Sequence, residues 1–194
     1  MLESLIHYSG EASLKPLKKT RIIAIIACFS ALCVATNYAM LPLLNVKLMD
    51  TIIFVAGFSF GVVPGVATAL TAWLIYGTLN PLGLSLPILV TVMFSETIYG
   101  LTGWLLGRNK HLTHASSSAE FFIIFGATGL LLTLVYDLIT NAVFGWLFFG
   151  SVWTGLLTMN FPMPMGLIHE LSNLTLFALV VPLIIQAIRR NLLR

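Results

Sequence analysis

Several side chains with acid–base or hydrogen-bonding chemistry interrupt long apolar runs of this sequence. Asp137 and Asn141 are four residues apart, and so are His169 and Asn173. Because residues four apart lie on one face of an α-helix, each pair would present its polar groups in the same direction. Glu96 lies in the middle of another apolar run. Ionisable groups in such runs mark either a water-filled cavity or hydrogen bonds that hold neighbouring helices together.

A catalytic role for these residues has little support. The segment from Gly57 to Gly61, GFSFG, matches the G-x-S-x-G motif, but that motif is meaningful only at a strand-to-helix turn. Here it lies in an apolar helical run. Ser59 is expected near the cytoplasmic side of the membrane and His169 near the outer side, too far apart for a hydrogen bond. The sequence contains no H-E-x-x-H metal motif and no Walker motif. We therefore expect no enzyme activity, no bound metal or cofactor, and no nucleic-acid partner.

The composition is typical of a membrane protein. Hydrophobic residues make up 58% of the 194 residues and charged residues only 9%, whereas a soluble domain carries about 25% charged residues. We therefore expect an all-α integral membrane protein that crosses the plasma membrane several times. Apolar runs occur at 22–41, 50–79, 86–107, 119–149 and 166–188. Crossing the lipid hydrocarbon takes about 20 residues, so each run except the second is interpreted as one helix.

The run 50–79 is too long for one span, and it carries Val63, Pro64 and Gly65 in its middle. Proline interrupts the helical hydrogen bonds and glycine permits a turn, so this run is predicted to form two short helices that separate there. The chain then has six transmembrane helices. We expect one six-helix domain over 21–190, preceded by a cytoplasmic segment over 1–20.

The basic residues favour six helices with both termini in the cytoplasm. Lysine and arginine accumulate on the cytoplasmic side of membrane proteins. Six spans place nine of these residues inside and only Lys47 outside, whereas five spans place four inside and six outside. The nine are Lys15, Lys18, Lys19, Arg21, Arg108, Lys110, Arg189, Arg190 and Arg194. The same topology places the polar side chains of the apolar runs in the outer half of the membrane.

Small residues form two stripes. Ala24, Ala27, Ala31 and Ala35 recur at three- and four-residue spacing in the first apolar run. Small residues allow a neighbouring helix to approach closely, so this stripe is either a docking face for a partner or a packing face within the bundle. The glycines of the 57–65 segment, spaced four apart, are interpreted as internal packing.

The arrangement resembles a known family, the substrate-binding S components of energy-coupling factor (ECF) transporters. The segments that carry the resemblance are LPLLNVKLMDTIIFVAGFSFGVVPG (41–65), GATGLLLTLVYDLITN (126–141) and HELSNLTLF (169–177), and the likeness covers roughly residues 20–190. In that family an A-x-x-x-A stripe of the first helix contacts a transmembrane T component. Ala27 and Ala31 match this stripe, and Ala24 extends it.

The resemblance implies a membrane-embedded subunit that captures a small water-soluble vitamin or related micronutrient. In that family the pocket faces outward, is formed by the later helices and is capped by the loop after the first helix. A T component and two cytoplasmic ATPases drive transport. The residues expected to bind the substrate are Asn37, Tyr38, Lys47, Glu96, Tyr136, Asp137, Asn141, His169, Glu170 and Asn173.

Two further expectations concern the ligand and the alternative function. Three acidic residues, Glu96, Asp137 and Glu170, are expected within the membrane, where only Lys47 and His169 could offset part of their charge. This excess of carboxylates favours a cationic or donor-rich ligand. The alternative is a self-sufficient secondary transporter or small channel that couples to protons or cations through Asp137 and Glu96. Internal inverted repeats, which are frequent in secondary transporters, are not visible in this sequence.

Overall fold

The computed structural model describes residues 18–80, 83–113 and 119–192, which form helices and connecting segments without any strand. Four helices are long and apolar enough to cross a membrane: α1, α4, α6 and α8. They coincide with four of the predicted runs, so the all-helical prediction is confirmed and a membrane location is supported. The helices are α1 (Lys19–Ala39), α2 (Met49–Phe60), α3 (Val62–Thr78), α4 (Leu86–Gly107), α5 (Lys110–Thr113), α6 (Ala119–Phe149), α7 (Val152–Thr158) and α8 (Met165–Leu192).

The run 50–79 does form two helices, but they separate at Gly61 and not at Pro64. Gly61 has a φ of 103°, a conformation that is accessible to a residue without a Cβ. Pro64 lies in the first turn of α3, where its missing N–H would have no helical partner in any case. The predicted position of the break is therefore wrong, because this proline is compatible with the start of a helix.

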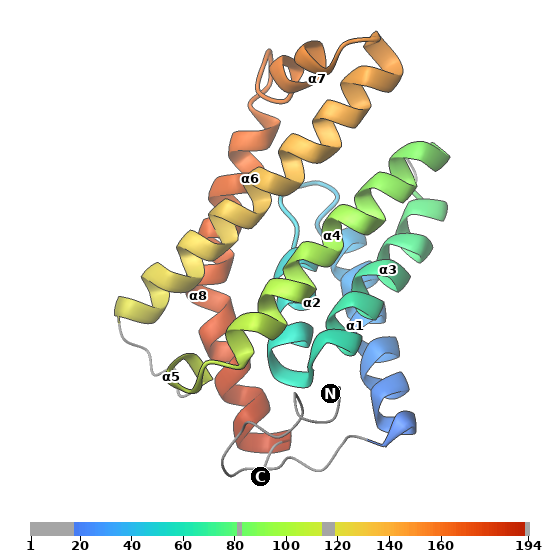
Figure 1. Ribbon diagram of the computed structural model, residues 1–194. Helices are drawn as coiled ribbons and strands as arrows, with labels where there is room; N and C mark the ends of the chain where they lie inside the picture. The colour runs from blue at the N-terminus through green and yellow to red at the C-terminus, as the bar shows by residue number, and fades with distance from the viewer. Residues whose placement is uncertain (1–17, 81–82, 114–118, 193–194) are drawn as a thin grey trace, which may run out of the picture.

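The chain runs back and forth between two ends of the molecule (Figure 1). The start of α1, the turn at Gly61 and α5 lie at one end, which we call the basic end. The 40–48 loop and α7 lie toward the other, which we call the loop end. Helices α2 and α3 have 12 and 17 residues, fewer than the roughly 20 that cross the lipid hydrocarbon. The presence of six transmembrane spans therefore stays a prediction.

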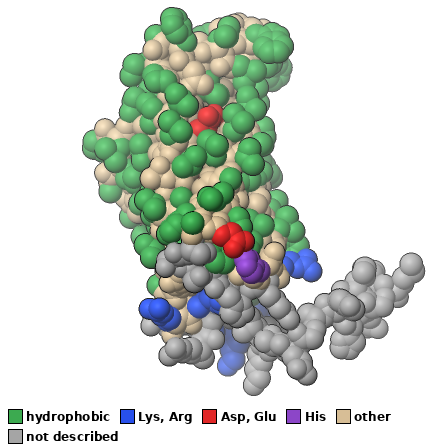
Figure 2. All heavy atoms as spheres, turned by 90° about the vertical axis from the view of Figure 1, so that its left-hand side faces the viewer, with side chains coloured by type: hydrophobic (Ala, Val, Ile, Leu, Met, Phe, Trp, Pro, Cys, Tyr) green, Lys and Arg blue, Asp and Glu red, His purple; other side chains and the backbone are tan. Residues whose placement is uncertain are grey.

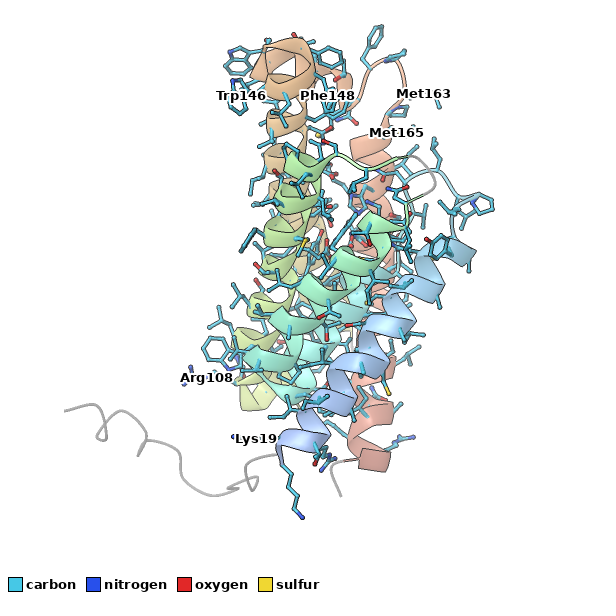
Figure 3. The ribbon with its side chains drawn as sticks, turned by 90° about the vertical axis from the view of Figure 1, so that its right-hand side faces the viewer. Lys19, Arg108, Trp146, Phe148, Met163 and Met165 are labelled. Carbon is cyan, nitrogen blue, oxygen red and sulfur yellow. The ribbon has the colours of Figure 1, made fainter. Side chains whose placement is uncertain are left out.

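Many large hydrophobic side chains of the described residues are exposed. Figure 2 shows hydrophobic side chains over most of one face, with lysine and arginine side chains toward the basic end. Figure 3 places Lys19 and Arg108 at the basic end, and Trp146 and Phe148 at the loop end. Basic residues on one side and tryptophan near helix ends are the arrangement expected across a bilayer.

The apolar segment 150–165 folds back against the end of α6. Gly145 of α6 and Gly155 of α7 approach so closely that a Cβ on either would overlap the backbone of the other. Trp153 and Phe161 are each 76% exposed, so this part of the loop end presents aromatic rings outward. α6 itself has 31 residues and is about 46 Å long at 1.5 Å per residue, longer than the lipid hydrocarbon of about 30 Å.

Helix α4 packs against α2 and α3 through glycines. A Cβ at Gly100 would overlap the backbone of Gly65, and a Cβ at Gly57 would overlap the carbonyl oxygen of Gly100. The predicted internal packing of the glycine stripe is thus confirmed for Gly57 and Gly65. The close approach also brings Trp73 of α3 beside Glu96 of α4, which are hydrogen bonded.

Replacing Gly100 with alanine should lower the free energy of unfolding by about 1–3 kcal/mol, the usual range for overpacking. The new methyl group would meet the backbone of α3, which cannot avoid it by a change of rotamer. Leu101→Ala is the matched control, because the neighbouring Leu101 side chain is exposed. Unfolding of the two purified variants in detergent measures the difference, and equal stabilities would contradict this packing.

Candidate functional site

The buried polar side chains meet in a cluster centred on His169, near the start of α8. Its Nε2 lies 2.8 Å from Oδ2 of Asp50 in α2, and its Nδ1 lies 3.0 Å from Oδ1 of Asp137 in α6. All three side chains are buried. A neutral imidazole donates through one nitrogen only, so this geometry requires either a protonated ring or a carboxyl group that carries a proton. In both cases the three side chains form one hydrogen-bonded unit that joins three helices.

Asn173 lies one turn after His169 and extends this unit. Its Nδ2 donates to Oδ2 of Asp50, and it lies 2.7 Å from Oγ1 of Thr133. The hydroxyl of Tyr99 in α4 donates to the same Oγ1 at 3.0 Å. The prediction that His169 and Asn173 share one face of a helix is therefore confirmed, and this face packs against α2 and α6. We call Asp50, Thr133, Asp137, His169 and Asn173 the polar cluster.

Glu96 is fully buried in α4 and accepts a hydrogen bond from the indole Nε1 of Trp73, at 3.0 Å. Its other oxygen, Oε1, accepts no hydrogen bond from the described residues, and neither does Oδ2 of Asp137. Buried polar atoms normally have a partner. The carboxylates of this region are therefore engaged with neighbouring side chains but only partly satisfied by them.

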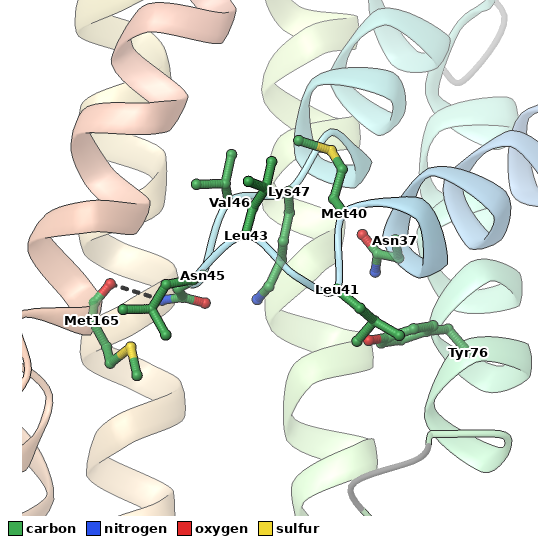
Figure 4. A pocket seen from close by; sticks show the side chains of 10 residues that line it. Asn37, Met40, Leu41, Leu43, Asn45, Val46, Lys47, Tyr76 and Met165 are labelled. Carbon is green, nitrogen blue, oxygen red and sulfur yellow. Dashed lines mark hydrogen bonds between the residues drawn. The ribbon is translucent and has the colours of Figure 1, made fainter.

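A cavity of about 410 Å³ lies at the loop end. Figure 4 shows it between the 40–47 loop, the end of α1, α3 and the start of α8. The loop is fastened to α8 by Asn45, whose Nδ2 donates to the carbonyl oxygen of Met165 at 2.8 Å. The lining residues are Asn37, Met40, Leu41, Leu43, Leu44, Asn45, Val46, Lys47, Tyr76 and Met165. We call this space the loop cavity.

Lys47 connects the loop cavity to the buried polar region. Its Nζ lies 5.7 Å from the ring centroid of Trp73 and 5.8 Å from that of Tyr136, within range of cation–π attraction to both rings. Among the described residues, no carboxylate oxygen lies within 4.0 Å of this nitrogen. The ammonium group is thus held between two aromatic rings without a direct ion pair.

The predicted substrate-binding residues near the loop fall at the cavity. Asn37 and Lys47 line it. Tyr38 does not line it; its ring packs on the lining residue Tyr76 with centroids 5.4 Å apart, and its hydroxyl donates to the carbonyl oxygen of Leu79 at 2.8 Å. Asn37 and Lys47 therefore lie where a ligand in the cavity would be, whereas Tyr38 packs against a residue of its wall.

The predicted substrate-binding residues of α4, α6 and α8 lie either in or beside the polar cluster or outside its hydrogen bonds. Asp137, His169 and Asn173 belong to the polar cluster, and the ring of Tyr136 packs edge-on against His169. Glu96 bonds Trp73 beside them. Asn141 instead donates to the carbonyl oxygen of Asp137 in its own helix, at 2.8 Å. Glu170 is half-buried beside the cluster and bonds none of its members.

Sequence reasoning missed Asp50, Trp73, Tyr99 and Thr133. Asp50 begins the apolar run 50–79 and is not among the residues predicted to bind substrate; it lies in the first turn of α2 and is buried. An acidic residue just before an apolar run is a helix-start signal that could have placed it there. The other three are single polar or aromatic residues in apolar runs, and no local pattern distinguishes them.

The alanine stripe of α1 is exposed along its whole length. Ala24, Ala27, Ala31 and Ala35 all lie on the surface. The residues that α1 buries against the other helices are Ser30, Cys33 and Asn37. The interpretation of the stripe as a packing face within the bundle is therefore wrong, and the stripe is open to lipid or to another protein.

No family model, curated protein or solved structure matches this chain. In the part of the chain that the structure describes, no group of three or more His, Cys, Asp or Glu side chains is arranged to hold a metal ion. The function must therefore be argued from the geometry of the loop cavity, the polar cluster and the α1 surface.

Replacing His169 with phenylalanine should lower the free energy of unfolding by about 3–5 kcal/mol, the range for removing one partner of a buried charged pair. Asp50 and Asp137 would then face each other without the donor between them. Adding Asp137→Asn to this variant should recover part of the loss. Thermal unfolding of the purified protein in detergent measures both effects.

The control for this experiment is Asn141→Ala, which removes a side-chain hydrogen bond made within α6 alone. It should change the free energy of unfolding by no more than about 1 kcal/mol. If His169→Phe were as stable as this control, the polar cluster would not be what holds α2, α6 and α8 together.

Proposed function

We propose that this chain is the membrane-embedded substrate-binding subunit of an ECF-type importer. It captures a small water-soluble vitamin or related micronutrient from outside the cell and delivers it with a transmembrane T component and an ATPase pair. The observation that carries the proposal is the division of α1. It presents an exposed alanine face from Ala24 to Ala35, and its far end leads into the loop that lines the cavity.

In this proposal the chain is a multi-pass protein of the plasma membrane with six spans. The basic end lies in the cytoplasm, because Lys19 and Arg108 gather there and positive residues stay on that side. The loop cavity then opens to the outside. Its volume, about 410 Å³, falls within the usual range for a small-molecule site.

The loop and the polar cluster have separate tasks in capture. The cluster fixes α8 relative to α2 and α6, and with it Met165, the α8 residue that lines the cavity and accepts the hydrogen bond from the loop. The 40–47 loop is the part that opens, and the hydrogen bond from Asn45 to Met165 holds it closed. Energy for release comes from the partner ATPases, since this sequence has no Walker motif.

A second candidate function is supported by the polar cluster itself. A carboxylate–imidazole–carboxylate chain inside a membrane bundle is the kind of group that proton-coupled transporters use as a relay. A self-sufficient transporter would move substrate when the purified chain alone is placed in liposomes with a proton gradient. Uptake that appears only with the T component and ATPases, and only with ATP, would favour the importer subunit.

The partner surface is tested by the double substitution Ala27→Trp and Ala31→Trp. Two indole rings on this exposed face would prevent close approach of another helix, so co-purification with the T component and ATP-driven uptake should both be lost. Substrate binding by the isolated variant should be unchanged, because these residues lie on the α1 surface and line no part of the cavity.

Leu131→Trp is the matched control, since Leu131 is an exposed residue of α6, which does not form the alanine face. It should leave assembly and uptake intact. Retained assembly in the alanine variant, or equal loss in the control, would contradict the proposed docking face.

A further inference from the structure

We infer that the loop cavity takes a small ring-containing ligand that carries an anionic group, a carboxylate or phosphate, and that Lys47 contacts this group. The inference rests on the proposed function, since it names the substrate class of the same site. It reverses the expectation of a cationic ligand, which came from counting carboxylates along the sequence.

The first argument is the charge that faces the cavity. Of the side chains that line it, Lys47 alone is charged, and no aspartate or glutamate contributes to the wall. Most of the other lining side chains are leucine, methionine and valine. A cationic ligand in this space would find no carboxylate and would lie against an ammonium group, and like charges in such a site repel.

The second argument is that Asp50, Glu96 and Asp137 lie outside the cavity lining and are each hydrogen bonded to a buried side chain. Asp50 and Asp137 are bonded to His169, and Asp50 also accepts from Asn173. Glu96 accepts from Trp73. A ligand cation could reach these groups only by displacing side chains that are buried and mutually bonded, which is strongly unfavourable.

The third argument is the state of Lys47. Its ammonium group lies near the rings of Trp73 and Tyr136 and has no carboxylate oxygen of the described residues within 4.0 Å. An ammonium group has three N–H donors and no acceptor. Figure 4 shows the Lys47 side chain between the Asn45–Met165 side of the cavity and the Leu41–Tyr76 side. It is therefore placed to donate to a ligand anion.

Two other groups define the rest of the ligand. Asn37 lines the same cavity, and its buried side-chain oxygen accepts no hydrogen bond from the described residues, so this residue suits an N–H or O–H donor of the ligand. The ring of Tyr76 lines the cavity and packs edge to face against that of Tyr38, and an aromatic ring in the wall suits a flat ring of the ligand. The ligand class is thus a ring with one donor and one anionic substituent.

The experiment uses the full chain in nanodiscs of phosphatidylcholine and three probes that share an indole ring with its N–H donor. These are the anionic indole-3-acetate, the neutral indole-3-acetamide and the cationic tryptamine. The readouts are the thermal unfolding temperature and the Kd at millimolar probe concentrations. We expect an anionic probe to stabilise the protein more than its neutral and cationic counterparts.

The variants assign the effect to one side chain. Lys47→Met should raise the Kd of the anionic probe about ten- to a hundredfold, the equivalent of one hydrogen bond to a charged group, and Lys47→Arg should retain most of the affinity. Lys19→Met is the matched control, because it removes an exposed lysine at the basic end. Its Kd should equal that of the unaltered chain.

Several results would overturn the inference. They are stronger stabilisation by a cationic probe, an anionic effect that survives in Lys47→Met, or no stabilisation by any anionic probe. Nanodiscs that contain phosphatidylglycerol test the other source of an anion. If that lipid alone stabilises the chain through Lys47, the group bound is a lipid headgroup and not a captured substrate.

Failure of this inference and failure of the proposed function give different results. A chain that assembles with a T component but retains a cationic organic molecule in native mass spectrometry would keep the function and remove the ligand class. A chain that binds anionic probes through Lys47, yet transports them alone in liposomes, would keep the ligand class and remove the importer subunit.

Discussion

An imidazole ring between two carboxylates is the interaction on which the interior of this protein depends. His169 lies within hydrogen-bond distance of Asp50 and Asp137, and these three residues belong to three helices. Removing charges from water is unfavourable, and only a well-formed set of hydrogen bonds offsets that cost. The same requirement makes the arrangement specific, because a shift of any one helix would leave a buried charge without its partner. The relative positions of α2, α6 and α8 follow from it.

Glycine contacts among α2, α3 and α4 position the residues next to the polar cluster. Gly57, Gly65 and Gly100 allow the backbones of α2, α3 and α4 to touch, and this closeness brings Trp73 to Glu96. The indole ring is then fixed at one edge by the carboxylate, and its face attracts the ammonium group of Lys47. A packing contact between helices therefore determines where a charged side chain of the loop lies.

Local patterns predicted the long helices well and the interior poorly. The runs that became α1, α4, α6 and α8 are recognised by length and apolarity alone. The break between α2 and α3 was predicted at Pro64 but lies at Gly61, because proline disrupts the interior of a helix and not its first turn. Asp50 and His169 are 119 residues apart in the chain, so no spacing rule relates them. Asn141 has the spacing of a site residue, yet it bonds its own helix.

The ligand expectation changed for the same reason. Along the sequence, Glu96, Asp137 and Glu170 appear as free acidic groups in the outer half of the membrane, and their number favours a cation. In the folded chain none of these three carboxylates lines the loop cavity, whereas Lys47 does, and its ammonium group has no carboxylate oxygen of the described residues within 4.0 Å. What a site recognises depends on the groups that face its cavity and not on the groups nearby. Here the lining side chain that carries a charge is Lys47, and Asp50 and Asp137 act by holding α8, which contributes Met165 to the wall.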